Sequence, residues 1–415
     1  MSIKNTLKKL IKESIDIIFP NYNNEIELTY YNDNKDIYYI SNIIVELDKK
    51  LYITDKEIFN RIKEKLNNQK IIKDIELLPD NNIKIFLKEE YLIEKLDKII
   101  NLDKDYGKNN LGNNQKINIE LSILDKDIDI NKHINTIINI DNKSRIMNYC
   151  GYEIEKEIYI NNDKDNNKIK ELTDNYRVYI DKYTNNKEIE DNYQIEDLLN
   201  KIRYYNICSI ENNSILLNTK EKEVLIDDYG NYTDYFKYLT HIYENYNNYD
   251  RLIIINNIEI KEALNLLNLD LDKIEIYNLE EKEIQEDSIN YIRYNSIINE
   301  TDDKNLIKIT KFNSKIDKII RNIENKKEDY NNINNNIIYN IINKLTDFED
   351  IIVESYKKDN LKIIITYLVE LISLINILIE RKSFFNPNII KMFKSSKIVI
   401  NNSLNIIGLI PIDEI

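Results

Sequence analysis

The sequence contains very few of the residues that bend or cross-link a chain. Its 415 residues include five glycines, four prolines, two cysteines and no tryptophan. No GxGxxG or GxxxxGK[ST] loop is present to cradle a phosphate, and two cysteines are too few for a disulfide framework or a four-cysteine zinc site. The start of the chain also lacks the pattern of a secretion signal. These absences predict a cytoplasmic protein in a reducing compartment.

Asparagine, isoleucine, lysine and tyrosine dominate instead, with 31 tyrosines. An apolar share of 42% in a chain of this length is enough for two or three domains with cores of their own. The formal net charge of −14 excludes a nucleic-acid binder that is basic over its whole surface, because phosphate binding needs clustered Lys and Arg. A local basic face remains compatible with this charge, and we expect no DNA partner.

One segment, 361–380, is long and apolar enough to cross a bilayer. Its polar residues recur every three or four positions and form one narrow stripe along a helix: Lys362, Thr366, Glu370, Ser373, Asn376 and Glu380. A charge at the centre of a bilayer is costly, whereas a bundle helix can present such a stripe to water. The pattern therefore favours a nearly buried bundle helix, and we expect no membrane.

Residues 1–101 have the pattern of a small α+β domain. Apolar spacing predicts two helices and three short strands, at 1–18, 54–67, 26–31, 36–40 and 82–87. Thr54 is a plausible cap for the second helix. The next segment, 102–115, holds two of the five glycines among Asn and Lys, which is typical of a linker.

Residues 116–287 alternate between strand and helix patterns, which is typical of a doubly wound parallel sheet. These elements are predicted at 117–121, 133–150, 153–160, 250–255 and 259–267. From residue 288 to 415 the strand signals fade, and long helical patterns predict a bundle. Its helices are expected at 306–328, 333–343, 361–380 and 389–407. The predicted fold class is therefore multidomain, with α/β and α parts.

The segment from Lys116 to Asp163 reads KINIELSILDKDIDINKHINTIINIDNKSRIMNYCGYEIEKEIYINND. It resembles the active-site strand and helix of the arginyl-tRNA synthetases, a class I family whose members read approximately VEFSSPNxAKPxHVGHxRSTIIGDxLARxLExLGYxVxxxNYIGDWG. After one deletion the shared positions are Glu120, Ser122, His133, Ile138, Asp141, Arg145, Gly151 and Tyr152. The resemblance implies a Rossmann-like class I core between an N-terminal domain that touches the tRNA elbow and a helical domain like the anticodon-binding domain.

Weaker matches follow the family's order along nearly the whole chain. YDRLIII at Tyr249–Ile255 resembles FDRIIYV, and NSLNIIGLIPIDEI at Asn402–Ile415 resembles NGLxLLGIxAPERM. Near the start, Tyr39 and Asn42 stand in a segment that resembles GDYxTNxAxxLAKKLG. The resemblance therefore makes Tyr39 and Asn42 candidates for contact with RNA.

The residues that would perform the chemistry depart from the family. Ile130 stands at the first signature histidine, and Lys132 stands at the glycine whose missing side chain lets ATP lie close to the helix start. Only His133 is retained, and the later Gly-Asp-Trp-Gly has become residues 161–164. The second signature loop, which steadies pyrophosphate through its lysines, is missing after Leu279.

The positions that bind arginine in the family have also changed. Its Thr-Arg-Asp aligns with Phe236, Lys237 and Tyr238, and its Gly-Ala-Asp aligns with residues 257–259. Removing a single preorganised donor at a transferring phosphate typically costs about 100- to 1000-fold in rate. We therefore expect a degenerate synthetase with no catalytic residues and no required cofactor, which retains binding to tRNA or a tRNA-like RNA.

Two alternatives stay open. The chain could be an active, divergent arginine–tRNA ligase that uses ATP and magnesium, with Lys132 and His133 at the ATP site. It could also be a protein-interaction or regulatory module that kept only the fold and binds a protein partner that the sequence does not identify.

The strongest local signal for RNA is the segment 381–397, RKSFFNPNIIKMFKSSK, which contains five cations and no acid. Lysines pair with phosphates and aromatic rings stack on unpaired bases. The candidates in this segment are Arg381, Lys382, Phe384, Lys391, Lys394 and Lys397. In the alternative interpretation, Phe384, Phe385 and Phe393 close the bundle core while the lysines keep it soluble.

The remaining reactive residues carry little signal. His133 and His241 are the only histidines, and neither lies in a nucleophile motif. Cys150 is interpreted as a core residue. The segment 125–129 begins like a calcium loop but lacks the glycine and the closing glutamate, so we predict no metal site.

Overall fold

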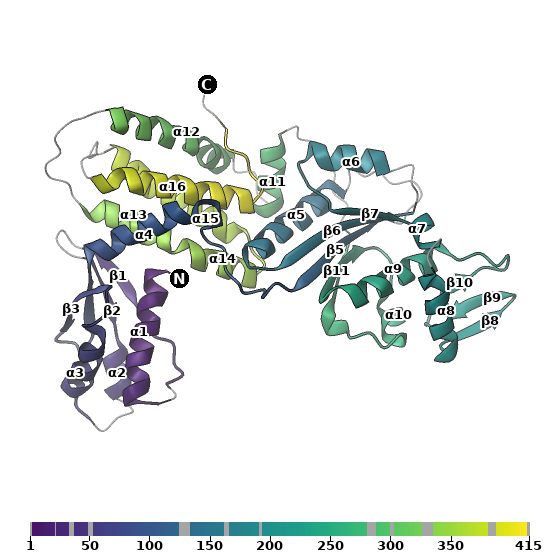
Figure 1. The fold of residues 1–415 in the computed structure, drawn as a ribbon, viewed down its shortest axis with the longest axis horizontal. Coiled ribbons are helices and arrows are strands. Elements are labelled where there is room, and N and C mark those ends of the chain that lie inside the picture. The colour runs from purple at the N-terminus through teal and green to yellow at the C-terminus, as the bar shows by residue number, and fades with distance from the viewer. Residues whose placement is uncertain are drawn as a thin grey trace. The chain divides into compact units, whose positions relative to one another are not determined.

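The computed structural model describes residues 2–20, 22–32, 37–48, 53–123, 133–161, 166–190, 193–279, 288–298, 303–325, 335–380 and 387–412. Two compact units divide the chain (Figure 1). The first unit combines both ends of the chain, Met1–Lys108, Asp302–Asn405 and Ile410–Ile415, and the second contains Asn109–Thr301 with Ile406–Leu409. The predicted N-terminal domain and most of the predicted helical domain thus belong to one compact unit.

The N-terminal part of the first unit is an antiparallel four-stranded sheet in the order β1-β2-β4-β3, covered on one face by helices. Its elements are α1 (Ile3–Ile18), β1 (Thr29–Asn32), β2 (Ile37–Ser41), α2 (Ile43–Asp48), α3 (Asp55–Leu66), β3 (Ile72–Leu77), β4 (Ile83–Leu87) and α4 (Glu89–Leu102). Thr54 caps α3 as predicted, because its side chain accepts a hydrogen bond from the backbone N–H of Glu57. Apolar residues at four-residue steps bury one side of α1 completely: Ile3, Leu7, Ile11 and Ile15.

The segment predicted to be a linker is a packed connection. After a short 3₁₀ helix, Asp103–Asp105, the Tyr106 side chain is buried and its hydroxyl donates to the Leu345 carbonyl at 3.1 Å. Gly107 follows with a φ of +98°, and a β-carbon there would lie 2.6 Å from the side chains of both Phe348 and Ile352. The scarce glycine therefore marks a turn that only glycine fits.

The described residues of the C-terminal part of the first unit form five helices: α12 (Asp303–Asn325), α13 (Asn335–Thr346), α14 (Phe348–Lys357), α15 (Lys362–Glu380) and α16 (Pro387–Ile406). Among the described residues, α15 is the one helix long and apolar enough to cross a membrane. Its apolar side packs inside the bundle. Its polar stripe meets lysines of neighbouring helices, with Lys344 on Glu370 at 2.5 Å and Lys308 on Ser373 at 2.8 Å.

The second unit is built on a parallel five-stranded sheet in the order β12-β11-β5-β6-β7, as the alternating pattern predicted. The helices α5 and α11 lie on one face, and α9 and α10 lie on the other (Figure 1). Its elements are β5 (Lys116–Ile123), α5 (Ile134–Tyr149), β6 (Glu153–Ile160), α6 (Asn166–Asn175), β7 (Lys182–Asn185), α7 (Asn186–Glu190), α8 (Gln194–Tyr204), β8 (Cys208–Glu211), β9 (Ser214–Leu217), β10 (Val224–Ile226), α9 (Asp234–Asn248), β11 (Arg251–Asn256), α10 (Lys261–Leu266), β12 (Ile274–Asn278) and α11 (Ile289–Ile298).

A second, antiparallel sheet of three strands, in the order β10-β9-β8, was not predicted. Its strands have only three or four residues each and are mostly not buried, so they carry no clear alternation of apolar and polar residues. The buried core of this half of the unit lies between α8, α9, α10 and the larger sheet. Cys150 is fully buried, as predicted.

We predict that Gly107→Ala destabilises the protein far more than Gly230→Ala. Both glycines have a φ near +90°, but the added β-carbon meets two side chains at position 107 and nothing within 4 Å at position 230. The backbone penalty alone is about 1–2 kcal/mol, and overpacking at position 107 adds about 1–3 kcal/mol. Thermal unfolding followed by circular dichroism measures the difference, and equal losses in the two variants would contradict the packed connection.

Candidate functional site

The centre of the second unit has the topology of a ligand-binding fold. The strand order reverses between β5 and β11, and ligands in open α/β sheets bind outside the carboxyl ends of the strands at such a switch point. Here that place is filled by Tyr238 from α9, whose side chain is 0% exposed. Its hydroxyl lies 2.5 Å from Ser122 Oγ near the end of β5 and accepts from Asn256 Nδ2, at the end of β11, at 3.0 Å.

These contacts form a directed chain of hydrogen bonds. Burial raises the pKa of Tyr238 well above its ordinary value, and the charge of Glu120 raises it further, so the phenol keeps its proton. Because Ser122 has a single hydroxyl proton and donates it to Glu120, Tyr238 is the donor in its contact with Ser122. Ser122 in turn donates to Glu120 Oε1 at 2.6 Å. This series of hydrogen bonds therefore ends on the buried carboxylate of Glu120.

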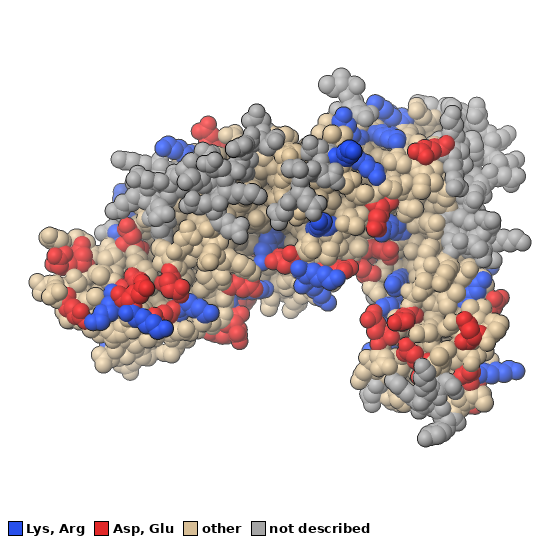
Figure 2. Space-filling view, turned by 180° about the vertical axis from the view of Figure 1, so that it is seen from behind, with Lys and Arg blue, Asp and Glu red and all other residues tan. Residues whose placement is uncertain are grey.

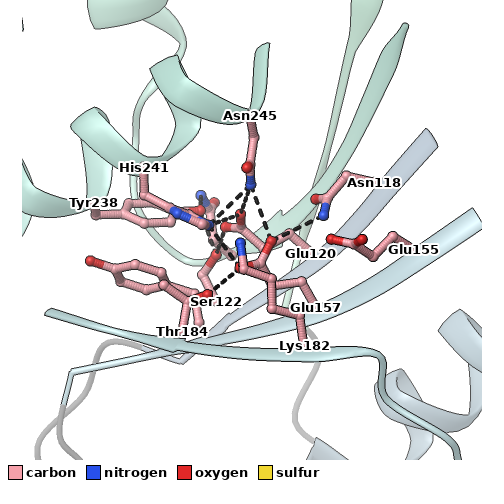
Figure 3. Close-up of polar contacts among 12 residues, drawn as sticks. Asn118, Glu120, Ser122, Glu155, Glu157, Lys182, Thr184, Tyr238, His241 and Asn245 are labelled. Carbon is pink, nitrogen blue, oxygen red and sulfur yellow. Dashed lines mark hydrogen bonds and ion pairs between the residues drawn. The ribbon is translucent and has the colours of Figure 1, made fainter. Parts of the chain in front are cut away.

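Glu120 is one of two carboxylates held against each other by the sheet. Glu120 on β5 and Glu157 on β6 are register partners on neighbouring parallel strands, and both are 1% exposed. His241 lies between them (Figure 3). Its Nε2 is 3.0 Å from Glu120 Oε2 and 3.4 Å from Glu157 Oε1. Alternation along the strands and the three- to four-residue steps of α9 bring these side chains to one face.

The charges in this cluster balance. Burial opposes the charged form of His241, but the two carboxylates outweigh it and raise the pKa of His241 to about 9. Burial would also raise the pKa of Glu157, yet hydrogen bonding and charge from His241, together with the charge of Lys182, lower it instead. Two carboxylates thus face two cations, because Lys182 Nζ lies 3.0 Å from Glu157 Oε1.

Neutral donors satisfy most of the remaining carboxylate oxygens. Asn118 and Asn245 donate to Glu157 Oε2 at 3.0 and 3.2 Å, and Thr184 donates to Glu157 Oε1. A carboxylate pair buried without such donors would be costly. The cluster is therefore a completed polar core.

The same three residues are the one group of metal-ligating side chains found in the described part of the chain. The ligand atoms of Glu120, Glu157 and His241 lie within 4.8 Å of one another, and His with carboxylates is a common donor set for zinc. The imidazolium and Lys182 already neutralise both carboxylates, so an ion here would add uncompensated positive charge. Sequence reasoning missed the cluster because its members are far apart in the chain.

Several residues of the segment Lys116–Asp163, which resembles the family's active-site strand and helix, form a second buried cluster on the opposite face of the sheet. Asp141 accepts from Lys156 at 2.8 Å, from Arg145 at 2.7 Å and from Arg293 at 3.0 Å. Burial would raise the pKa of Asp141, but the three cations lower it. These contacts join α5 to β6 and α11, so Asp141 and Arg145 are scaffold residues.

The signature remnant is only partly within the described residues. His133 lies at the start of α5, is 5% exposed, and has no hydrogen-bond partner for Nδ1 among the described residues. Lys132, Ile130 and the segment 125–129 lie outside the described residues. The arrangement therefore brings His133 to a helix N-terminus, as predicted, without showing a partner for it.

The two residues predicted to contact RNA near the start of the chain, Tyr39 and Asn42, are not free on the surface. Tyr39 is 1% exposed and its hydroxyl donates to Asn343 at 2.6 Å, so it cannot present its ring to RNA and that prediction is wrong. Asn42 is half-buried, and its side-chain nitrogen lies 3.3 Å from carboxylate oxygens of Glu27 and Glu46. An amide between two acids is a poor neighbour for a phosphate.

The lysines of α16 are paired with acids from other helices. Lys391 forms an ion pair with Asp97 at 2.6 Å, and Lys397 forms one with Asp317 at 2.6 Å. Lys394 is exposed. Phe393 is fully buried, which confirms the core interpretation for this ring. The candidates Arg381, Lys382 and Phe384, together with Phe385, lie outside the described residues.

A different aromatic surface lies on the open face of the N-terminal sheet. Tyr31, Tyr38 and Phe86 are register partners on β1, β2 and β4, and their rings form one row. The Tyr31 and Tyr38 rings are stacked with centroids 5.7 Å apart, and Lys84 Nζ lies 3.7 Å from the centre of the Tyr38 ring. Tyr31 is 44% exposed. We call these four residues the open aromatic row.

The open aromatic row is a local feature on a surface of mixed charge. On the face drawn in Figure 2, basic and acidic side chains are interspersed in each part of the molecule. Adjacent tyrosines at 30–31 and 38–39 indicate that one ring of each pair lies on the open face, because neighbouring residues of a strand point to opposite faces. The sequence does not tell which member of each pair faces the core.

The architecture as a whole defines a class of proteins. A parallel sheet covered by helices, followed by a helical C-terminal region, is the plan of a class I aminoacyl-tRNA synthetase core with its anticodon-binding domain. Two family models match the chain: the arginyl tRNA synthetase N terminal domain at residues 5–87, and the DALR anticodon binding domain at residues 288–415.

Individual relatives agree with these models. An arginine–tRNA ligase of Listeria monocytogenes is 28% identical over 139 residues, which cover 33% of this chain and 25% of the ligase. One of Oceanobacillus iheyensis is 26% identical over 125 residues, covering 30% and 22%. The alignments thus span about a quarter of the length of these curated relatives.

A solved structure agrees over a longer range. The arginyl-tRNA synthetase of Plasmodium falciparum superposes with a TM-score of 0.63 at 13% identity, covering 100% of this chain and 99% of that chain. This likeness shows the fold. The chain belongs to the arginyl-tRNA synthetase family, and the predictions of family and fold class are confirmed.

We predict that His241→Gln lowers the free energy of unfolding by about 3–5 kcal/mol near neutral pH, because it leaves two buried carboxylates without their shared cation. The pKa of His241 rises from 6.5 in the unfolded chain to about 9 in the folded protein. Its contribution is therefore complete below about pH 6.5 and is lost as the pH rises through about 9. Urea unfolding followed by circular dichroism measures the effect.

His133→Gln is the matched control, since it replaces the only other histidine. This variant keeps His241, so its free energy of unfolding should follow the same pH dependence as that of wild type. A gap between wild type and His241→Gln that stays constant from neutral pH to above pH 9 would contradict the charged pair.

Proposed function

We propose that this protein is a non-catalytic member of its family that binds tRNA or a tRNA-like RNA in the cytoplasm. The observation that carries the non-catalytic part is Tyr238, which fills the switch point of the sheet where a substrate would lie. A closed polar core in that place offers a ligand neither space nor an unpaired charge.

The neighbouring positions support the same conclusion. Phe236 and Tyr238, which align with the family's Thr-Arg-Asp, are both fully buried. Asn257, which aligns with the first residue of Gly-Ala-Asp, accepts from the backbone N–H of Leu279 at 3.1 Å. Three of the six positions that the resemblance assigns to arginine, Phe236, Tyr238 and Asn257, thus have an internal structural task or an apolar ring. No cofactor is required by this function.

Binding to RNA is supported by other parts of the chain. The two matched family models describe an N-terminal domain and an anticodon binding domain of tRNA synthetases. The open aromatic row adds a chemical reason, because rings in a row on a sheet can stack unpaired bases while a lysine beside them meets phosphate. With Lys391 and Lys397 paired to acids, we place the main contact at this row.

The two alternatives make different demands. An active arginine–tRNA ligase would need ATP and magnesium near Lys132 and His133. A protein-interaction module is favoured by one observation, a group of large apolar side chains exposed in the second unit: Tyr193, Tyr204, Ile210 and Tyr229.

We predict no ATP–pyrophosphate exchange above background when arginine, magnesium and tRNA are all present. Lys132→Gly should not restore exchange, because Tyr238 still closes the switch point. The L. monocytogenes ligase is the positive control under the same conditions. Exchange by the wild-type protein that disappears in His133→Ala would overturn the non-catalytic assignment.

We also predict that Tyr31→Ala with Tyr38→Ala weakens tRNA binding. Loss of base stacking is worth about 1–3 kcal/mol per base, so the dissociation constant should rise between about 5-fold and about 150-fold. Lys84→Ala should weaken binding further and reduce its salt dependence. Filter binding over a series of salt concentrations measures these changes, and the dissociation constants of the variants are compared at equal salt.

Tyr204→Ala is the control, because it removes a tyrosine of the other unit that is more exposed than Tyr31, at 85% against 44%. If this control loses as much affinity as the double variant, or if heparin competes as well as tRNA does, the open aromatic row is not the RNA contact.

A further inference from the structure

The small sheet of the second unit ends in an open strand. Its order is β10-β9-β8, so β10 and β8 are its two edges (Figure 1). The outer side of β10 is closed by the chain that follows it, because the backbone N–H of Thr233 donates to the Leu225 carbonyl at 3.0 Å and Tyr232 forms a bridge with Ile226. Among the described residues, β8 has no strand on its outer side.

The hairpin determines which backbone groups of β8 point outward. The two-residue turn at 212–213 has a positive φ at both positions, so Glu211 and Ser214 beside it form a hydrogen-bonded pair. Pairs along an antiparallel ladder alternate between hydrogen-bonded and non-hydrogen-bonded. The N–H and C=O groups of Cys208 and Ile210 therefore point away from β9, to the open side.

The strand β8 also lacks features that often protect an edge. It contains no proline and no lysine, and its register with β9 has no bulge. Ile210 is 76% exposed at this edge. An unprotected edge with an exposed apolar side chain is a template for another strand.

Charges at the two ends of β8 favour an antiparallel strand of the same sequence. Burial raises the pKa of the Cys208 thiol and the charge of Arg203 opposes this rise, so Arg203 lies near that end of the strand. Arg203 is exposed and has no ion pair among the described residues. Glu211, which contacts Lys222 at 2.5 Å, is exposed at the other end. A twofold axis makes the two strands antiparallel and brings the Arg203 end of each copy to the Glu211 end of the other.

We propose that β8 pairs with the β8 strand of a second copy of this chain, in an antiparallel register with the twofold axis at Ser209. Cys208 of each copy then lies opposite Ile210 of the other, and the two such pairs exchange about four backbone hydrogen bonds. The small sheets of the two copies join into one continuous sheet. This goes beyond the proposed RNA binding and does not depend on it.

Ile210→Pro tests the pairing, because proline removes the outward N–H and leaves the ladder to β9 complete. Sedimentation equilibrium of the full wild-type chain should show a concentration-dependent dimer. Ile210→Val is the matched control, since its side chain is similar in size to proline and it keeps the N–H. The proline variant should have a dissociation constant about tenfold or more above that of the valine variant, because each dimer loses two hydrogen bonds.

Two results would overturn the proposal. A wild-type chain that stays monomeric at every concentration would leave the edge to a different protein, and equal dissociation constants of the two variants would place the dimer contact elsewhere. Circular dichroism of Ile210→Pro shows whether the monomer keeps its fold.

Disulfide cross-linking tests the register and covers the case in which Ile210→Pro does not fold. On the axis, the Cα atoms of the two copies of residue 209 lie about 4.5 Å apart, within the range of a disulfide. Ser209→Cys combined with Cys208→Ser should therefore cross-link two chains under mild oxidation. The one remaining cysteine, Cys150, is fully buried.

Glu211→Cys combined with Cys208→Ser is the matched control. Its two copies lie four residues apart along the pair, about 14 Å, so they should not cross-link. Residue 211 is more exposed than residue 209, so random collision would favour the control. Cross-linking of the control as efficient as that of Ser209→Cys, or none with Ser209→Cys, would contradict the proposed register.

Discussion

The second unit depends on one electrostatic constraint, the need of two neighbouring carboxylates for a shared cation. Glu120 and Glu157 are brought side by side by the parallel register of β5 and β6. Without His241 their repulsion in a buried setting would push the strands apart or force one of them to take up a proton. The imidazolium therefore fixes how α9 sits on the sheet. Tyr238, one turn earlier on α9, is held in the switch point by the same docking.

Local features of the fold could be predicted from the sequence, because their causes lie within a few residues. The cap at Thr54, the strand 153–160 and the polar stripe of α15 all follow from spacing alone. The three-stranded sheet β10-β9-β8 escaped because its strands are too short to show a period. The linker at 102–115 was misjudged, since polar composition hides the packing of Tyr106 and Gly107 against a distant helix.

The candidate sites could not be predicted in this way, because they depend on contacts between residues that are distant in the sequence. Tyr39 was chosen where its neighbour Tyr38 faces the open side, and a shift of one residue in a strand reverses the face. The run 381–397 contains no acid, yet Asp97 and Asp317 supply acids from elsewhere in the fold. Pairing of Glu120 with Glu157 needs a strand register that a single sequence does not reveal.

The series of hydrogen bonds from Asn256 through Tyr238 to Glu120 also restricts the order in which these buried residues can be substituted. An acid at position 238 would add a third carboxylate beside two that share one imidazolium, so it is tolerated only after the cluster has lost a negative charge. Replacing His241 is in turn costly while both glutamates remain. Tyr238 and His241 on α9 thus restrict which substitutions are tolerated at each other's positions. Opening the switch point to a ligand therefore requires several simultaneous substitutions.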